Sequence, residues 1–395
     1  MSEGAPQPAS PGELHVASSS KRIPELDGLR GIAILSVVLM HFFYNPDPSL
    51  TGPVHLIQRT FALGWSGVDL FFVLSGFLIG GILMDHRDSP NYFKTFYLRR
   101  AFRILPIYYL WICLFIGLIL IGGPFLRAHT HSGQLPAINF AIYQHFLFLQ
   151  NLWQVDFKSS SAYLWLAPMW SLAVEEQFYL VSPLLVRFMP RRLLPGVLGA
   201  VVFVAPVLRI FVRLHSGAEV PWAAYRLMPC RADSLAIGML LAYAWRSEQI
   251  RKEILRKPVR LYLLFIALLA GVFVIWWRYP APEDAVTQTI GYSVIALFYA
   301  ALLLIAIGLP SGPIARFTRW GVFQEFGRIS YCLYLIHSAV GYFCSGLLTR
   351  RINSFTDWRS GLVGVASLVV AYVICRTSWT YFEHPLLQRG HRFKY

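Results

Sequence analysis

The sequence has 395 residues, of which 56% are hydrophobic and 14% are charged, and apolar stretches of nearly membrane-spanning length recur along it. This composition excludes a soluble domain and predicts an all-α, polytopic integral membrane protein. The formal net charge of +15 indicates a membrane orientation and contact with anionic membrane lipids, and not nucleic-acid binding. The five cysteines have neither a metal-binding spacing nor a disulfide framework, so we predict no metal site.

The two ends of the sequence are polar. Residues 1–21 are dominated by Ser, Pro, Gly and Ala and predict a disordered cytoplasmic tail. No apolar segment with a small-residue cleavage site begins the chain, so we expect no cleavable signal peptide and a first membrane helix that serves as an uncleaved signal. Residues 22–388 form the predicted membrane domain, and residues 389–395 form a basic cytoplasmic tail. No second soluble domain is expected.

Apolar runs predict about ten transmembrane helices. The segment 139–153, NFAIYQHFLFLQNLW, is apolar but short, and we interpret it as a possible re-entrant or interfacial segment. The ten helices are expected at residues 28–44, 61–84, 100–122, 171–189, 193–213, 231–246, 258–278, 288–309, 325–347 and 361–382.

Lys and Arg gather in alternate loops of this arrangement. They precede the first helix, lie between the second and third, follow the fourth, sixth and eighth, and close the chain. The positive-inside rule therefore predicts a multi-pass protein of the plasma (inner) membrane with both termini cytoplasmic. Counting 139–153 as a further span would place Arg191 and Arg192 outside, so we favour ten spans.

The stretch RGIAILSVVLMH in the first predicted helix begins and ends with an ionisable residue. Arg30 and His41 are eleven residues apart, about 16 Å along a helix and close to three whole turns, so both side chains lie on one face. We expect Arg30 at the cytoplasmic mouth and His41 near the membrane midplane or just beyond it. A histidine at that depth is costly unless it faces protein or water, so it is either functional or a packing histidine bonded to a neighbouring helix.

Carboxylates occur in the fourth and second predicted helices. In MWSLAVEEQFYL, Ser171 and Glu175 share a helix face, and Glu175 or Glu176 is expected near the outer end, within reach of the depth of His41. The alternative is a carboxylate at a helix end that lies at the membrane interface. Asp69 is expected in the outer part of the second helix.

A polar stripe is predicted on the ninth helix. In GRISYCLYLIH, Ser330, Tyr334 and His337 are spaced four and three residues apart, which places them on one face, with His337 as a second mid-depth histidine. In CRADSLAIG, Arg231 and Asp233 flank the start of the sixth helix, and capping of that helix is the favoured interpretation.

Two arginines mark the beginning of the third helix. In FYLRRAFRILP, Arg100 and Arg103 are three residues apart and share a face. Guanidinium groups fit phosphate oxygens well because they donate two parallel hydrogen bonds. The alternative is that the pair only anchors the helix at the cytoplasmic surface.

Taken together, these motifs resemble the membrane acyltransferase family 3, which includes O-acetylases of bacterial surface glycans. The resemblance covers about residues 22 to 385 and implies that the domain 22–388 is a membrane acyltransferase domain. Some members carry a further secreted hydrolase-like domain after the membrane part. No such domain is seen before the sequence ends at Tyr395, so this chain is expected to be a stand-alone member. The resemblance is carried by PELDGLRG, the spacing of Arg30 and His41, GVDLFFVLSGFLI, YLRRAFRILP, WSLAVEEQFYL, RADSLAIG, ISYCLYLIH and YFEHP.

The resemblance implies transfer of an acyl group, usually acetyl, from a cytoplasmic coenzyme A thioester to a hydroxyl group. The acceptor is expected to be a carbohydrate or glycolipid, such as lipopolysaccharide, exopolysaccharide or peptidoglycan. Arg30, Arg100 and Arg103 are expected to hold the phosphates of acetyl-CoA (acyl-CoA) at the cytoplasmic face, with its acyl arm reaching inward.

His41 has a side chain that can take a proton from a sugar hydroxyl near neutral pH, and Glu175 or Glu176 is expected to orient it. No serine elbow or cysteine nucleophile is visible, so direct transfer is favoured over an acyl-enzyme, with an acyl-histidine as the less favoured variant. The residues expected to contact the acceptor are Asp69, Ser330, Tyr334 and His337.

Two other classes of protein fit the composition. Ten helices with buried His, Glu and Arg residues suit a proton-coupled transporter or flippase of a glycan or lipid precursor, although no inverted pair of broken helices is evident. A non-catalytic sensor or scaffold with the same fold is the third possibility.

Overall fold

The computed structural model describes residues 23–44, 51–129, 142–153, 165–216, 222–349 and 355–395. These residues form helices and no strand, which confirms the predicted all-α membrane fold. The predicted N-terminal tail 1–21 lies outside the described residues. The α-helices are α1 Pro24–Phe43, α2 Gly52–Thr60, α3 Gly67–Asp85, α4 Tyr92–His129, α5 Tyr143–Phe146, α6 Gln150–Trp153, α8 Trp170–Phe188, α9 Leu194–Ser216, α10 Ala223–Arg226, α11 Met228–Arg246, α12 Glu248–Arg256, α13 Pro258–Arg278, α14 Tyr292–Gly308, α15 Pro313–Thr318, α16 Gly321–Arg328, α17 Ser330–Thr349, α18 Trp358–Ser378 and α19 His384–His391.

Short helical turns of other types interrupt these helices. Two are 3₁₀ turns, at Gly64–Ser66 before α3 and at Ala167–Met169 before α8. Two are π-helical turns, at Thr287–Gly291 before α14 and at Trp379–Glu383 between α18 and α19. A π-helical turn adds one residue to a turn and thereby changes the direction of the side chains that follow it.

Eight helical segments of the described chain are long and apolar enough to cross a membrane. They agree with eight of the ten predicted spans, although several begin or end outside the predicted bounds. The largest differences are nine residues, at the start of Gly52–Asp85 and at the end of Trp358–His391. Helix α4 begins at Tyr92, eight residues before the predicted start. The eight segments are Pro24–Phe43, Gly52–Asp85, Tyr92–Leu118, Leu194–His215, Pro258–Arg278, Thr287–Gly308, Ser330–Thr349 and Trp358–His391.

The other two predicted spans, 171–189 and 231–246, form the helices α8 and α11. Each is 19 residues long, but each carries charged residues and neither belongs to the apolar set. Helix α11 packs against α3, α9 and α14, and α8 packs against α3 and α11. The count of ten spans therefore stays a prediction.

The segment 139–153 does not form a spanning helix where it is described. Residues 142–153 contain only α5 and α6, which are four residues long each. The hydroxyl group of Tyr108 on α4 donates to the carbonyl oxygen of His145 at 2.8 Å, and the side-chain amide of Gln150 donates to the carbonyl oxygen of Met169 at 2.7 Å. These contacts hold the segment between α4 and the start of α8, as a short non-spanning element.

Several basic loops gather at one end of the bundle. Helices that alternate in direction would bring these loops to the same end, and ion pairs between the loops support that predicted arrangement. Which side of the membrane this end faces stays a prediction. The pairs are Asp88 with Arg187 and Arg191, Asp85 with Arg246, and Glu25 with Arg319.

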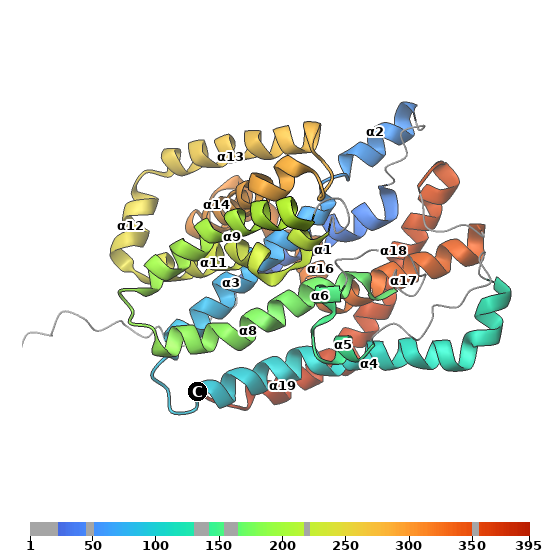
Figure 1. The fold of residues 1–395 in the computed structure, drawn as a ribbon, viewed down its shortest axis with the longest axis horizontal. Helices are drawn as coiled ribbons and strands as arrows, with labels where there is room; N and C mark the ends of the chain where they lie inside the picture. Colours follow the sequence, from blue (N-terminus) through green and yellow to red (C-terminus); the bar gives the residue numbers. More distant parts are fainter. Residues whose placement is uncertain (1–22, 45–50, 130–141, 154–164, 217–221, 350–354) are drawn as a thin grey trace, which may run out of the picture.

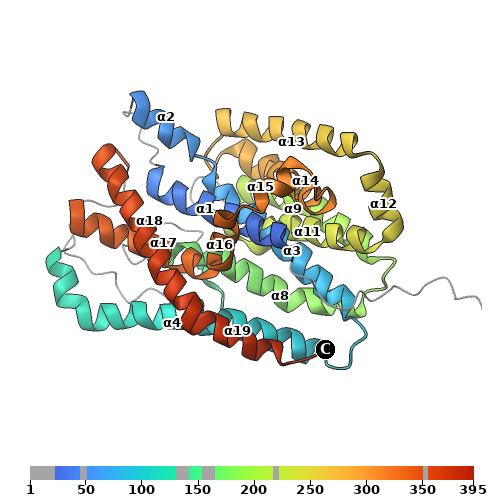
Figure 2. The same ribbon diagram turned by 180° about the vertical axis from the view of Figure 1, so that it is seen from behind.

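Helices α4 and α19 lie side by side at one edge of the molecule, opposite α13 (Figures 1 and 2). The chain ends beside the beginning of α4 (Figure 1). The predicted basic tail 389–395 therefore has a defined place, because its first residues continue α19 and the rest contacts α4.

Helix α1 is in direct backbone contact with α16. A Cβ atom on Gly31 would lie 1.8 Å from the carbonyl oxygen of Phe323, and a Cβ atom on Gly327 would lie 1.9 Å from the carbonyl oxygen of Asp27. Only glycine fits at these two positions, because any larger residue would separate the helices.

Candidate active site

The polar face of α1 meets the polar stripe of α17. Nη2 of Arg30 donates to Oγ of Ser330 at 3.0 Å, and Nδ1 of His41 lies 3.3 Å from Nε2 of His337. Because Arg30 precedes His41 and Ser330 precedes His337, the two helices run in the same direction. The structure thus brings together two patterns that the sequence predicts separately.

The hydrogen bonds of the two histidines define their tautomers. Nδ1 of His337 lies 3.0 and 2.9 Å from the carbonyl oxygens of Leu333 and Tyr334, and Nδ1 of His41 lies 2.9 Å from that of Val37. A carbonyl oxygen only accepts, so each Nδ1 carries a hydrogen, and Nε2 of neutral His337 accepts from Nδ1 of His41. The lone pair of neutral His41 is therefore on Nε2, the nitrogen that can take a proton.

The two histidines differ in accessibility. The His41 side chain is exposed, whereas His337 has 0% of its surface exposed. Only His41 can meet a substrate directly. His337 is placed to orient it and to accept its Nδ1 hydrogen bond, as the second member of a catalytic pair does.

His41 lies near the far end of α1. At a rise of 1.5 Å per residue, Arg30 is about 9 Å and His41 about 26 Å from the start of α1, a helix about 30 Å long. The helix starts at Pro24, four residues before the predicted start, and ends at Phe43. The depth of His41 near the membrane midplane stays a prediction.

Tyr334 completes the contact between α17 and α8. Its hydroxyl group lies 2.6 Å from Oγ of Ser171, and its ring centroid lies 6.0 Å from that of His337. The residues of these contacts form one polar seam through an apolar bundle. The polar seam consists of Arg30, Ser330, Ser171, Tyr334, His337 and His41.

Three arginines gather at one end of the polar seam. Arg30 and Arg100 both act electrostatically on Arg103, so the three form an arginine cluster. The Arg100 guanidinium lies over the Tyr179 ring, 5.6 Å from its centroid. No salt bridge involves any of the three among the residues that the structure describes. Because α4 starts at Tyr92, Arg100 and Arg103 lie inside this helix and not at its beginning as predicted.

Glu175 belongs to this end of the seam. Its Oε2 accepts from the hydroxyl group of Tyr179 at 3.2 Å, and that hydroxyl lies 2.5 Å from Oγ of Ser75 on α3. Glu175 is within electrostatic range of Arg30 and Arg100. The structure thus places this carboxylate between hydroxyl groups and the arginine cluster.

Glu176 shares part of this neighbourhood, because it interacts electrostatically with Glu175. It is within electrostatic range of Arg100, Tyr108 and Tyr331. Between described residues, no hydrogen bond joins Glu175 or Glu176 to His41. Among the described residues, the side chain of His41 contacts that of His337, and the role of a carboxylate in orienting His41 stays a prediction.

Asp69 lies in a separate buried cluster. It is 0% exposed and forms an ion pair with Arg231 at 2.5 Å. Asp233 pairs with Arg209 at 2.9 Å, again with both side chains at 0% exposure. We call these four residues the charge-pair cluster. Arg231 and Asp233 therefore bind buried partners across helices, where helix capping was predicted, and Asp69 has no surface that an acceptor could reach in this conformation.

Ser330, Tyr334 and His337 are also buried, at 1, 5 and 0% exposure. Their polar atoms bind Arg30, Ser171 and His41, as described above. This placement suits residues that position α1 and α8. The sequence-based expectation was a direct contact with the acceptor, and it stays a prediction that the structure does not favour.

The sequence analysis missed Glu383. This carboxylate is 7% exposed, accepts from Oγ of Ser378 at 3.1 Å, and lies within electrostatic range of Arg103 and Arg30. The π-helical turn that carries it precedes Pro385, whose ring and missing N–H disfavour a regular turn. The available signal was the motif YFEHP.

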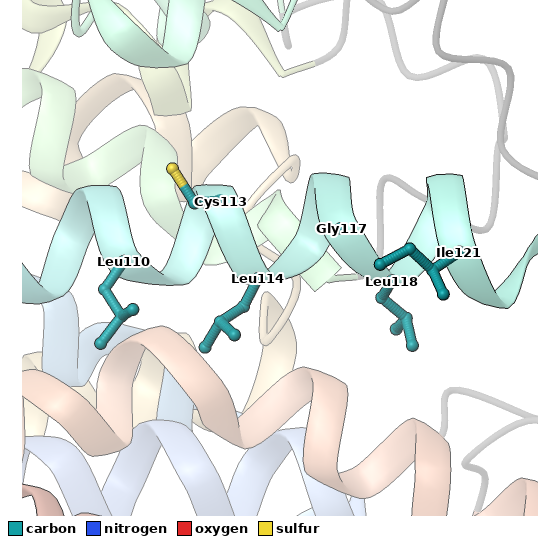
Figure 3. Close-up of a pocket in the computed structure, with 6 residues that line it drawn as sticks. All are labelled: Leu110, Cys113, Leu114, Gly117, Leu118 and Ile121. Carbon is teal, nitrogen blue, oxygen red and sulfur yellow. The ribbon is translucent and has the colours of Figure 1, made fainter.

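An open depression on the outer face of α4 is unrelated to the seam. It has a volume of about 530 Å³ and is lined by apolar residues and Cys113, all from α4 (Figure 3). Such an apolar surface is expected to face lipid acyl chains. Across the described residues, no group of three or more His, Cys, Asp or Glu side chains could hold a metal ion.

Comparison with known families agrees with the motifs. The model of the Acyl_transf_3 family, described as an acyltransferase domain, matches residues 23–376. The chain belongs to this family. The match includes every residue of the polar seam and the arginine cluster, and it stops before Glu383.

The chain is also similar to two curated proteins. O-acetyltransferase OatA of Staphylococcus aureus (strain NCTC 8325 / PS 47) is 27% identical over 383 residues, which cover 94% of this chain and 58% of that protein. Peptidoglycan O-acetyltransferase OatA of Listeria monocytogenes is 24% identical over 380 residues, which cover 94% of this chain and 57% of that protein. The chain thus spans less than two thirds of the length of these relatives. No solved structure matches it.

Proposed function

We propose that this protein is an integral membrane O-acetyltransferase that moves an acetyl group from cytoplasmic acetyl-CoA to a hydroxyl group of a carbohydrate or glycolipid acceptor. The observation that carries the proposal is the polar seam, which links an exposed histidine to an arginine cluster that has no salt bridge among the described residues. Family membership and the printed names of the relatives support the reaction. The name of the Listeria relative makes peptidoglycan the first acceptor to test.

The arginine cluster is the proposed donor site. Three guanidinium groups in a membrane interior repel one another, and such charges are retained where an anion or a functional partner balances them. Coenzyme A is a phosphate-rich anion, and arginine binds phosphate through parallel hydrogen bonds. Arg100 and Arg103 on α4 and Arg30 on α1 would hold the phosphates, with Glu175, Tyr179 and Glu383 fixing the guanidinium groups.

His41 is the proposed general base. Its Nε2 takes the proton of the acceptor hydroxyl while the hydroxyl oxygen attacks the thioester carbonyl carbon. The C–S bond of the tetrahedral intermediate then breaks, and the imidazolium returns the proton to the departing coenzyme A sulfur. His337 orients the ring and accepts its Nδ1 hydrogen bond throughout. We prefer this direct transfer to an acyl-histidine. In direct transfer Nε2 only takes and returns a proton, whereas an acyl-histidine would require the same nitrogen to attack the thioester carbon.

Membrane geometry fits a donor and an acceptor that arrive from opposite sides. The donor site lies at the end of the seam nearer the basic loops, and His41 lies near the other end of α1. We propose that the basic loops and both termini are cytoplasmic, in the plasma membrane, and that the acceptor enters from the outer side. Reporter fusions near Arg191 and at Tyr395 should both report the cytoplasm. An outside signal near Arg191 with an inside signal at Tyr395 would refute the ten-span topology.

The experiment that tests the function uses radiolabelled acetyl-CoA with membranes that contain the protein and a glycan acceptor. The expected result is label bound covalently to the acceptor, in an amount that depends on His41. A transporter or flippase would leave no covalent label, and neither would a sensor. Absence of label on every glycan and lipid fraction refutes the proposed activity.

A further inference from the structure

The last residues of the chain lie against the beginning of α4. Oγ1 of Thr95 donates to the carbonyl oxygen of Lys394 at 2.8 Å, and Nε of Arg99 donates to the carbonyl oxygen of Phe393 at 2.9 Å. These two bonds fix the backbone that carries Tyr395. They also place Tyr395 within electrostatic range of Arg99 and Arg100, so its ring lies at the edge of the arginine cluster.

The Tyr395 ring contacts planar groups from two parts of the chain. Its centroid lies 4.0 Å from that of the His86 ring, and the two planes are 1° apart. The Arg99 guanidinium lies over the same ring, 5.0 Å from its centroid. His86 directly follows α3 and Arg99 belongs to α4, so the two planar groups converge from different elements on one aromatic ring.

The imidazole of His86 is suited to stacking. Burial lowers the pKa of His86, Arg99 and Arg246 act in the same direction, and Asp85 opposes them. The ring is therefore neutral at neutral pH. A neutral imidazole and a guanidinium are both planar groups that bind the π-face of an aromatic ring, and every nucleobase has such a face.

We propose that His86 and Arg99 form the subsite for the adenine ring of the donor, and that adenine displaces the Tyr395 ring when it binds. The inference rests on the proposed function, since the donor there is coenzyme A. Adenine is joined through ribose to the phosphates that Arg100 and Arg103 are proposed to hold. The Tyr395 ring lies within electrostatic range of both Arg99 and Arg100, so an adenine in its place would lie close to the phosphate site.

Displacement of a side chain has a measurable consequence. A ligand that binds only when the Tyr395 ring has left has an affinity reduced by the fraction of time that the ring is away. Removal of the ring should therefore tighten binding of any ligand with an adenine. A ligand without adenine does not occupy the subsite and does not require the Tyr395 ring to move. Its affinity should therefore not depend on Tyr395.

The experiment compares coenzyme A with 4′-phosphopantetheine, which has the same thiol arm and no adenine. Binding of each is measured by calorimetry to the purified 395-residue chain in detergent. Tyr395→Ala should tighten coenzyme A binding about fivefold or more, the scale of one stacking interaction, and leave phosphopantetheine binding unchanged. Tyr395→Phe keeps the ring and is the matched control, with wild-type affinity for both ligands.

A second variant tests the stacking groups themselves. Adding His86→Ala to Tyr395→Ala removes one face of the subsite and should reverse the gain for coenzyme A alone. Thermal melting without ligand controls for folding of each variant. If Tyr395→Ala leaves coenzyme A affinity unchanged, or shifts both ligands equally, the adenine subsite is refuted and the proposed donor stands. If the wild-type protein binds neither ligand, the proposed donor and the subsite are both refuted.

Discussion

Two groups of arginines lie among the helices of this protein, and their surroundings differ. The arginines of the charge-pair cluster are fully buried, and those of the arginine cluster are half-buried. In the charge-pair cluster between α3, α9, α11 and α14, each arginine has a carboxylate at ion-pair distance, and all four side chains are 0% exposed. In the arginine cluster between α1 and α4, no arginine has such a partner among the described residues. A charge with a carboxylate at ion-pair distance holds helices together, whereas we propose that a charge without such an ion pair is available to a ligand. The comparison distinguishes arginines that pair with carboxylates inside the protein from arginines that we propose bind the donor.

The largest effect is expected at the reactive end of the polar seam. His41→Gln should lower turnover by about 10²- to 10⁴-fold, the usual contribution of general base catalysis, because an amide cannot take a proton at neutral pH. Donor binding and membrane levels should stay normal. The measurement is transfer of labelled acetyl groups at matched protein levels.

His337→Gln is the companion variant. It should cost less activity, because His337 positions His41 and is too buried to meet substrate. If the His41 variant keeps wild-type turnover while the His337 variant is inactive, the assignment of the base is reversed and the class of enzyme is unaffected.

The second largest effect concerns stability, in the charge-pair cluster. Asp69→Asn leaves Arg231 buried without its counter-charge, which should cost about 3–5 kcal/mol of unfolding free energy. The matched control is Asp85→Asn, which breaks the half-exposed pair with Arg246 and should cost at most about 1 kcal/mol. Unfolding in detergent measures both. Equal stabilities for the two variants would show that the charge-pair cluster does not hold the helices together.

In the arginine cluster, removal of a charged side chain should lower the affinity for the donor and not the stability of the fold. Arg100→Ala and Arg103→Ala should each weaken acetyl-CoA binding by about 10- to 100-fold, the scale of one charge-assisted hydrogen bond, with little loss of stability. Lysine at either position should restore part of the affinity, because it keeps the charge and loses the fork.

The control for these variants is Arg191→Ala, which removes a basic residue of the same end of the bundle and should leave donor affinity unchanged. Normal donor binding by both alanine variants would make Arg100 and Arg103 topological anchors, and the two regions would then not differ in function.

The smallest effect is expected where the seam supports the arginine cluster. Ser330→Ala removes the hydrogen bond to Arg30, so donor affinity should fall about fivefold, which corresponds to about 1 kcal/mol. Ser367→Ala removes a buried serine of α18 whose hydroxyl, among the described residues, binds only the carbonyl oxygen of Val363. This variant should have no effect on donor binding. A loss of affinity in both variants would indicate a general packing defect.

Sequence periodicity was sufficient for features that belong to one helix. The shared face of Arg30 and His41 and the stripe of Ser330, Tyr334 and His337 follow from helical spacing alone. The pairing of His41 with His337 does not, because 296 residues separate them and no spacing rule links distant helices. A glutamate was therefore chosen as the partner of His41 on chemical grounds, and the structure places a histidine there.

Other predictions differ from the structure where a charged residue was interpreted without knowledge of the residues that pack against it. The basic stretch before residue 100 was assigned to a loop, but contacts with α8 and α19 keep it helical from Tyr92. Asp69 was expected to contact the acceptor from the outer part of the second predicted helix. Its partner Arg231 is 162 residues away in the sequence and neutralises it. The π-helical turn at Glu383 depends on a local change in hydrogen bonding that composition does not encode.

The glycine contact between α1 and α16 has a consequence for which donors the enzyme accepts. Arg30 and His41 are on one helix with no proline between them, and α1 is held against α16 without intervening side chains. The distance of about 16 Å between these two residues along α1 is therefore fixed. For the proposed reaction, the protein selects its donor by the length of the arm between phosphate and thioester: a shorter or longer carrier would present its carbonyl above or below the base, whichever acyl group it carried.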